Sequence, residues 1–132
     1  MRASRLGRYS WTMFDWANQP FYTLIMTFVF SVYFTDVFIV GEDGAQKLTL
    51  TQTISGLAIA ILSPVLGSIT DIKGNRKLWM GLTSLVFVLG MTLLWYAYPG
   101  APEGIWLVMF GLIIASAMVG FAEVFNNSML AV

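Results

Sequence analysis

A short stretch near the N-terminus combines a carboxylate, two side-chain amides and a phenol within an apolar run. These side chains follow one another at i, i+3, i+4 and i+7, which places them on one face of a helix: Asp15, Asn18, Gln19 and Tyr22. Ionisable groups near hydrocarbon are costly and usually face a cavity or a partner. The pattern therefore predicts a path for a polar substrate or a proton. The alternative is that Asp15 and Asn18 cap the helix at the membrane boundary and favour its dipole.

A second polar face lies near the C-terminal end, in a stretch where Glu123 is the single acidic residue. Helical spacing groups it with three other side chains: Ser116, Asn126 and Asn127. At about 1.5 Å per residue, a helix that starts at Ile105 has advanced roughly 27 Å at Glu123. This depth matches that of Asp15 on a helix running the other way, so both carboxylates are predicted in the same half of the membrane. The alternative places Glu123 and the asparagines among lipid headgroups at a helix end.

The composition limits the chemistry available to these side chains. Hydrophobic residues make up 58% of the chain and charged residues 11%, which is typical of membrane proteins. The absence of Cys and His removes thiolate nucleophiles, histidine bases and the common zinc sites. Seven basic and seven acidic residues balance, so no nucleic-acid partner is indicated. We expect neither an enzyme nor a bound metal or cofactor.

Four apolar stretches are long enough to cross a bilayer, which needs roughly 20 helical residues. They cover about 14–40, 51–70, 78–98 and 105–130. The connections between them are rich in residues that stop helices, and the first is predicted at 41–48. Pro20 is expected to kink the first span or to mark its true start. That span is too long for the core of a signal peptide and lacks a cleavage pattern, so we interpret it as a retained helix. The fold class expected is an all-α membrane protein with four transmembrane helices.

The distribution of basic residues predicts the orientation of these helices. Lys47 lies on one side of the membrane, and six basic residues lie on the other: Arg2, Arg5, Arg8, Lys73, Arg76 and Lys77. Lys and Arg accumulate in cytoplasmic segments. We therefore expect an integral, multi-pass protein whose N-terminus is cytoplasmic, with a bacterial cell membrane as its location.

Between the second and third stretches lies a polar segment with ordered spacing. Its marked positions are a glycine, an aspartate, a second glycine and a basic pair: Gly67, Asp71, Gly74, Arg76 and Lys77. This order resembles the loop between the second and third helices of major facilitator superfamily transporters. Ile72 and Asn75 stand where that family usually has Arg or Lys. The resemblance implies a charge network that controls conformational change. The alternative is that Asp71 merely helps to end a helix and that the basic residues merely hold the loop in the cytoplasm.

The first stretch carries a more specific resemblance. Residues 14–19 read Phe-Asp-Trp-Ala-Asn-Gln, followed by Pro20 and Phe21. This run resembles the opening helix of the vacuole-effluxer-like branch of the superfamily, in which Ser is usual where Gln19 stands. Asn127 matches an asparagine near the end of the corresponding part of that branch. The resemblance implies export of amino acids or similar small metabolites by alternating access, with proton coupling, and it implies that the polar faces of the first and fourth helices line a central cavity.

The second stretch carries small residues at helical spacing, namely Gly56, Ala60, Ser63 and Gly67. Such stripes let a neighbouring helix approach closely in lipid. The superfamily has about twelve helices in two halves, so 1–132 is expected to supply four helices of the N-terminal six-helix half and to need the remaining helices as partners. Two alternatives stay open. One is a four-helix small multidrug-type transporter that works as a dimer, and the other is a membrane scaffold subunit that transports nothing.

Overall fold

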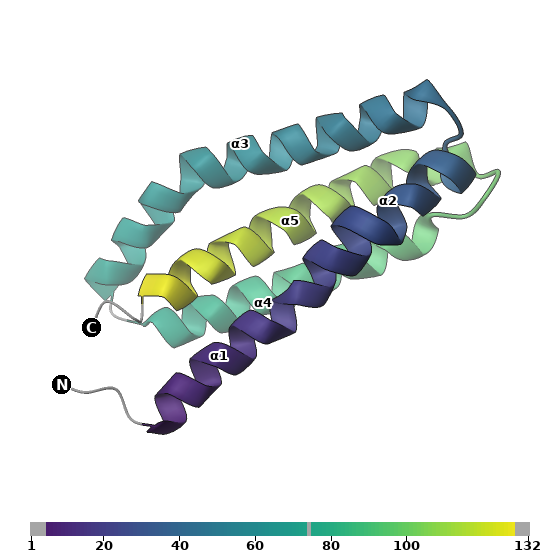
Figure 1. The fold of residues 1–132 in the computed structure, drawn as a ribbon. Coiled ribbons are helices and arrows are strands. Elements are labelled where there is room, and N and C mark those ends of the chain that lie inside the picture. Colours follow the sequence, from purple (N-terminus) through teal and green to yellow (C-terminus); the bar gives the residue numbers. More distant parts are fainter. Residues whose placement is uncertain (1–4, 74, 129–132) are drawn as a thin grey trace.

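The described residues, 5–73 and 75–128, are almost entirely helical in the computed structural model of the protein (Figure 1). The elements in chain order are α1 (Arg5–Pro20), η1 (Phe21–Phe28), α2 (Phe30–Tyr33), η2 (Phe34–Phe38), α3 (Glu42–Lys73), α4 (Arg76–Leu93), η3 (Leu94–Tyr96), η4 (Pro102–Gly104) and α5 (Ile105–Ser128). Within the described residues, four helical segments are long and apolar enough to cross a membrane: Arg5–Phe38, Glu42–Ile69, Arg76–Tyr96 and Ile105–Ser128. We call these the first to fourth spans. The predicted fold class is confirmed.

Helix α3 extends beyond the predicted second stretch at both ends. Helix α3 begins at Glu42, so the predicted connection at 41–48 is wrong. The reversal is made at Gly41, whose φ of 95° lies in the left-handed region that glycine tolerates. Glu42 and Asp43 then occupy the first turn of α3, where negative charge is favoured by the helix dipole. At its other end α3 continues to Lys73, so Gly67 and Asp71 lie in the helix and not in a loop.

The first span stays helical past Pro20 but changes its hydrogen-bonding pattern there. Pro20 has no N–H to donate and ends α1, and the wider π-helix η1 follows. The Val29 N–H donates to the Leu24 carbonyl oxygen at 2.8 Å, an i to i−5 bond. Figure 1 shows α1 and α2 as parts of one continuous rod. The proline is therefore accommodated by widening the helix, and the described helix already includes Arg5, ahead of the predicted stretch.

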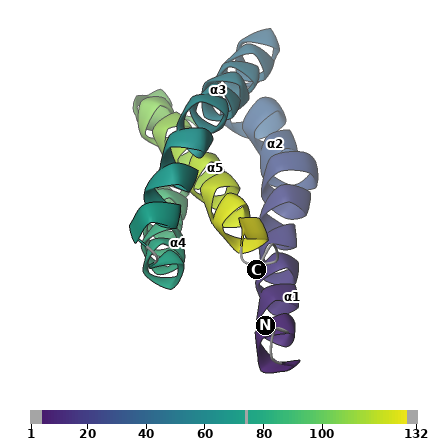
Figure 2. The same ribbon diagram turned by 90° about the vertical axis from the view of Figure 1, so that its left-hand side faces the viewer.

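Helix α5 is the centre of the bundle. It packs against α3, α4 and the first span, and Figures 1 and 2 show it enclosed by them. In its most apolar 18-residue window 61% of residues are buried, against 6% for α3. Its buried side chains meet Phe34 and Phe38 towards one end, Phe21 in the middle and Ile59 towards the other end. The outer faces of the remaining helices are apolar and exposed, as lipid contact requires.

The closest helix crossing joins α4 and α5. A Cβ placed on Gly111 would lie 2.7 Å from the Gly90 carbonyl oxygen, so only glycine fits at this contact. The stripe on α3 forms no comparable crossing, since a Cβ at Gly56 or Gly67 would meet no described atom within 4 Å. The tight packing predicted for that stripe is thus absent from the described part of the chain. Gly111 and Ala115, spaced i and i+4, carry the same small-residue signal, and these are the residues at which the close helix crossing forms.

Candidate functional site

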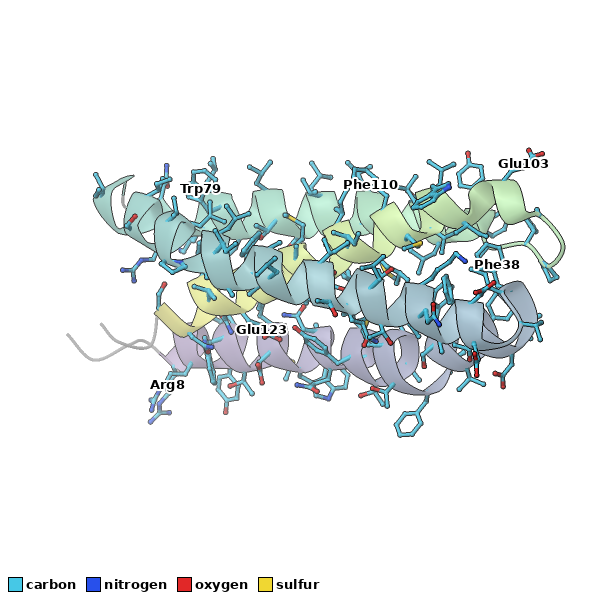
Figure 3. All side chains as sticks on the ribbon, turned by 90° about the horizontal axis from the view of Figure 1, so that it is seen from above. Arg8, Phe38, Trp79, Glu103, Phe110 and Glu123 are labelled. Atoms are coloured by element: carbon cyan, nitrogen blue, oxygen red, sulfur yellow. The ribbon has the colours of Figure 1, made fainter. Side chains whose placement is uncertain are left out.

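The polar faces of the first and fourth spans meet near one end of the bundle. Figure 3 shows Glu123 on α5 towards the end that carries Arg8, beside the first span. The Tyr22 hydroxyl and the Glu123 carboxylate interact electrostatically across the two spans. Tyr22 lies in the first turn of η1, immediately after the change in helix type at Pro20. Both side chains are partly buried, so the pair is screened less by solvent than a surface pair.

Asp15 belongs to the same electrostatic cluster. Its carboxylate repels that of Glu123, although Asp15 itself is exposed. Asp15 and Tyr22 are seven residues apart and lie on the same face of the first span. The chain carries no Lys or Arg between Arg8 and Lys47 or after Lys77. The cluster therefore combines two acidic groups and a phenol, and the basic residues of the first span, Arg5 and Arg8, precede it in the N-terminal turns of α1.

Two further contacts set the register between the faces. The Ser116 hydroxyl lies 3.7 Å from the Met26 sulfur, one helical turn beyond Tyr22. Nearer the end of the bundle, the Trp11 indole donates a hydrogen bond of 3.1 Å to the backbone carbonyl of Asn126. The contacts of Trp11, Tyr22 and Met26 therefore follow one line along the first span, and their partners follow one line along α5.

Asn18 lies between Asp15 and Tyr22 on this face and has an unusual environment. Its side-chain nitrogen is buried and has no hydrogen-bond partner in the described part of the chain. Buried donors are rarely left unpaired, because each costs about 1–3 kcal/mol. The Asn18 amide is therefore a donor available to a group that the described residues do not supply.

The other predicted site residues differ in their exposure. Asn126 is buried at 3% exposure, whereas Gln19 and Asn127 are exposed. The structure thus brings Asp15, Tyr22 and Glu123 together. It gives no contact that would bring Gln19 or Asn127 into the same cluster.

The polar segment after α3 is described in part. Gly74 lies outside the described residues, and for Asp71 only the helical backbone is described. Arg76 donates a hydrogen bond of 2.8 Å from Nη1 to the Ser128 carbonyl oxygen, the last of α5. Lys77 is exposed. Arg76 therefore ties the start of the third span to the end of the fourth, a role that its spacing from Asp71 did not indicate.

The chemistry that this arrangement supports is non-covalent. Among the described residues no three His, Cys, Asp or Glu side chains are grouped as a metal site would require. Carboxylates paired with a phenol can hold a proton or a protonated amine. Trp11 and Met26 were not chosen from the sequence as site residues, although both follow the helical spacing of Asp15 and Tyr22.

The four spans make the chain an integral, multi-pass membrane protein. It is similar to the uncharacterized MFS-type transporter YxiO of Bacillus subtilis (strain 168), with 31% identity over 127 residues. The matched region covers 92% of this chain and 28% of that relative, so the chain spans less than a third of the relative's length. No protein-family model matches the chain. No solved structure matches it either.

Proposed function

We propose that this chain forms four helices of the N-terminal half of a secondary active transporter of the major facilitator superfamily. The observation that carries the proposal is the pairing of Tyr22 and Glu123 between the first and fourth spans, with Asp15 beside them. In a transporter, ionisable groups inside the membrane mark substrate and ion pathways. The similarity to an MFS-type transporter supports the same function independently.

The mechanism follows from the charges. Asp15 and Glu123 repel one another, and a proton or a substrate ammonium group that binds between them relieves this repulsion. When the cavity opens to the other side of the membrane, the proton or the amine leaves and the repulsion returns. Binding and release at this pair couple the substrate to the rocking of one half of the transporter against the other.

Asn18 supplies the complementary group. Its unpaired amide donor fits the carboxylate of a substrate whose ammonium group lies at Glu123. An amino acid carries both groups. The substrate class proposed is therefore amino acids or similar small metabolites, in agreement with the vacuole-effluxer-like resemblance of residues 14–21. Export is the direction that this resemblance implies.

The test is transport by the full-length protein in liposomes. A mixture of radiolabelled common amino acids is loaded inside or outside, and flux is followed with and without an imposed pH gradient. We expect Glu123→Gln to abolish the response to the gradient, because the amide cannot exchange a proton. The matched control is Glu103→Gln, which neutralises an exposed acid at the other end of the bundle and is expected to keep normal flux. Equal, gradient-dependent flux in Glu123→Gln and the unmodified protein contradicts the proposal.

A further inference from the structure

The N-terminal turns of α1 carry a groove near one end of the bundle. It has a volume of about 380 Å³ and is lined by Arg5, Arg8, Tyr9 and Thr12. These residues are spaced i, i+3, i+4 and i+7, so they share one face, and no residue of α1 is buried. Figure 2 shows the N-terminal end of α1 extending past the ends of α4 and α5. The groove therefore lies at the periphery of the bundle.

The two arginines have no described partner. Neither the Arg5 nor the Arg8 guanidinium makes a hydrogen bond or an ion pair with another described residue. The acid of the same helix, Asp15, is seven residues from Arg8, or about 10 Å along the axis. Guanidinium groups bind phosphates through paired N–H donors. Together with the Tyr9 hydroxyl, the groove offers cationic and neutral donors to one anionic group, while the Thr12 hydroxyl donates to the Arg8 carbonyl oxygen at 3.0 Å.

The side chains next to the groove suit the rest of a lipid. Trp16 is one turn beyond Thr12 on the same face and is 71% exposed, and the neighbouring Met13 is 57% exposed. Tryptophan and tyrosine prefer the level of the lipid headgroups, and apolar side chains lie below them. From the helix end inwards, this part of α1 presents guanidinium groups, then hydroxyls, then the exposed side chains of Met13 and Trp16. Cationic groups thus lie at the helix end and apolar and aromatic groups lie deeper, which matches the phosphate and the acyl chains of a phospholipid.

We propose that Arg5, Arg8, Tyr9 and Thr12 form a binding site for the headgroup of an anionic phospholipid. The lipid's acyl chains run along the outward face of the first span past Met13 and Trp16. The site is separate from the Asp15, Tyr22 and Glu123 cluster and does not depend on the transport function proposed above. It fixes the first span at the membrane surface on the side predicted to be cytoplasmic.

The experiment compares lipid classes at a single labelled position. Because the chain has no cysteine, Met13→Cys gives one site for a fluorophore in these four helices, and any cysteine elsewhere in the full-length protein is replaced first. The protein is placed in nanodiscs that contain spin-labelled phosphatidylglycerol or spin-labelled phosphatidylcholine as quencher in the same phosphatidylcholine background. We expect stronger quenching by phosphatidylglycerol, with the apparent preference falling about fivefold for each arginine changed to glutamine.

Two controls separate this site from a general effect of charge. Lys77→Gln removes one exposed cation at the same end of the bundle but away from the groove, and it is expected to leave the preference unchanged. Inorganic phosphate added in excess is expected to leave the quenching unchanged, because the acyl chains contribute to binding. Equal quenching by both lipids in the unmodified protein overturns the proposal. So does an equal loss in Lys77→Gln and Arg8→Gln, or displacement of the lipid by phosphate.

Discussion

The Trp11 indole donates a hydrogen bond to the Asn126 carbonyl oxygen, 3.1 Å away, and so attaches the first span to the final turn of the fourth. Nearby in α5, the carbonyl of Phe125 accepts from the Ser128 hydroxyl at 2.8 Å, and that of Ser128 accepts from Arg76. Side chains of the first and third spans thus bind backbone carbonyl groups in the same part of the central helix.

This arrangement predicts the effect of Trp11→Phe. The substitution keeps an aromatic ring but leaves a buried carbonyl without its donor, which costs about 1–3 kcal/mol. We expect a lower Tm for the full-length protein in detergent. Trp16→Phe is the matched control, because Trp16 is 71% exposed and makes no such bond, and its effect is expected within about 0.5 kcal/mol of zero. Equal Tm values for the two variants contradict this role of Trp11.

The crossing of α4 and α5 predicts that Gly111→Ala destabilises the protein. The added methyl group would lie 2.7 Å from the Gly90 carbonyl oxygen and 2.8 Å from the Leu93 Cβ, so the two helices must separate. Overpacking of this kind costs about 1–3 kcal/mol. Gly81→Ala on α4 adds the same methyl group in open space, and we expect it to be neutral or to raise the Tm slightly through helix propensity. Unfolding in detergent measures both, and a tolerated Gly111→Ala shows that the crossing is not tight.

The sequence indicated the spans well because hydropathy depends on the composition of a segment and not on its neighbours. Helix ends were predicted less well. The acidic residues 42 and 43 suggested a loop, but a single glycine makes the reversal and both acids stabilise the first turn of α3. The change to a π-helix after Pro20 was not foreseen either, because sequence shows that a proline disturbs a helix but not how the backbone compensates.

The candidate site was predictable in part for a related reason. Helical spacing placed Tyr22 and Glu123 on polar faces, and a count of residues along the axis placed Asp15 and Glu123 at similar depth. The interaction of Tyr22 with Glu123 also depends on how the helices are placed sideways, and this is fixed by contacts such as Gly90 with Gly111. In lipid all apolar faces are similarly favourable, so small residues and polar contacts decide which helix faces meet. A single sequence shows that these residues are present, but it does not show which residues of the other helices they contact.

The orientation predicted from basic residues can be tested by labelling. Asn75 lies between α3 and α4, and Gly100 lies in the connection before α5, so the two exposed positions are at opposite ends of the bundle. Single cysteines at these positions are expected to react with a membrane-impermeant thiol reagent from opposite sides. Asn75→Cys should react from the cytoplasm, since the basic residues gather at its end. Reaction of both from outside would contradict this topology.

The polar segment predicts a conformational effect of Asp71→Asn in the full-length transporter. If Asp71 docks against a distant helix end, as the superfamily resemblance implies, its neutralisation changes the balance between inward-open and outward-open states while insertion stays normal. Accessibility of single cysteines in the cavity measures that balance. Asp43→Asn, which neutralises an exposed acid at the other end of α3, is the control and should leave it unchanged. Unchanged accessibility in Asp71→Asn reduces Asp71 to a helix stop.

The pairing of Tyr22 with Glu123 predicts non-additive effects on transport. Tyr22→Phe removes the hydroxyl and Glu123→Gln removes the charge, and if the two groups act together the double variant is little worse than Glu123→Gln alone. Coupling between residues in contact is about 0.5–3 kcal/mol, so the rates should deviate from additivity by roughly twofold or more. Tyr33→Phe provides the control, since the Tyr33 hydroxyl donates to the Ala97 carbonyl oxygen at 2.6 Å, away from Glu123. Initial rates of flux in liposomes are measured for two double-mutant cycles, Glu123 with Tyr22 and Glu123 with Tyr33. Additive effects in both cycles would show that Tyr22 and Glu123 do not act as one unit.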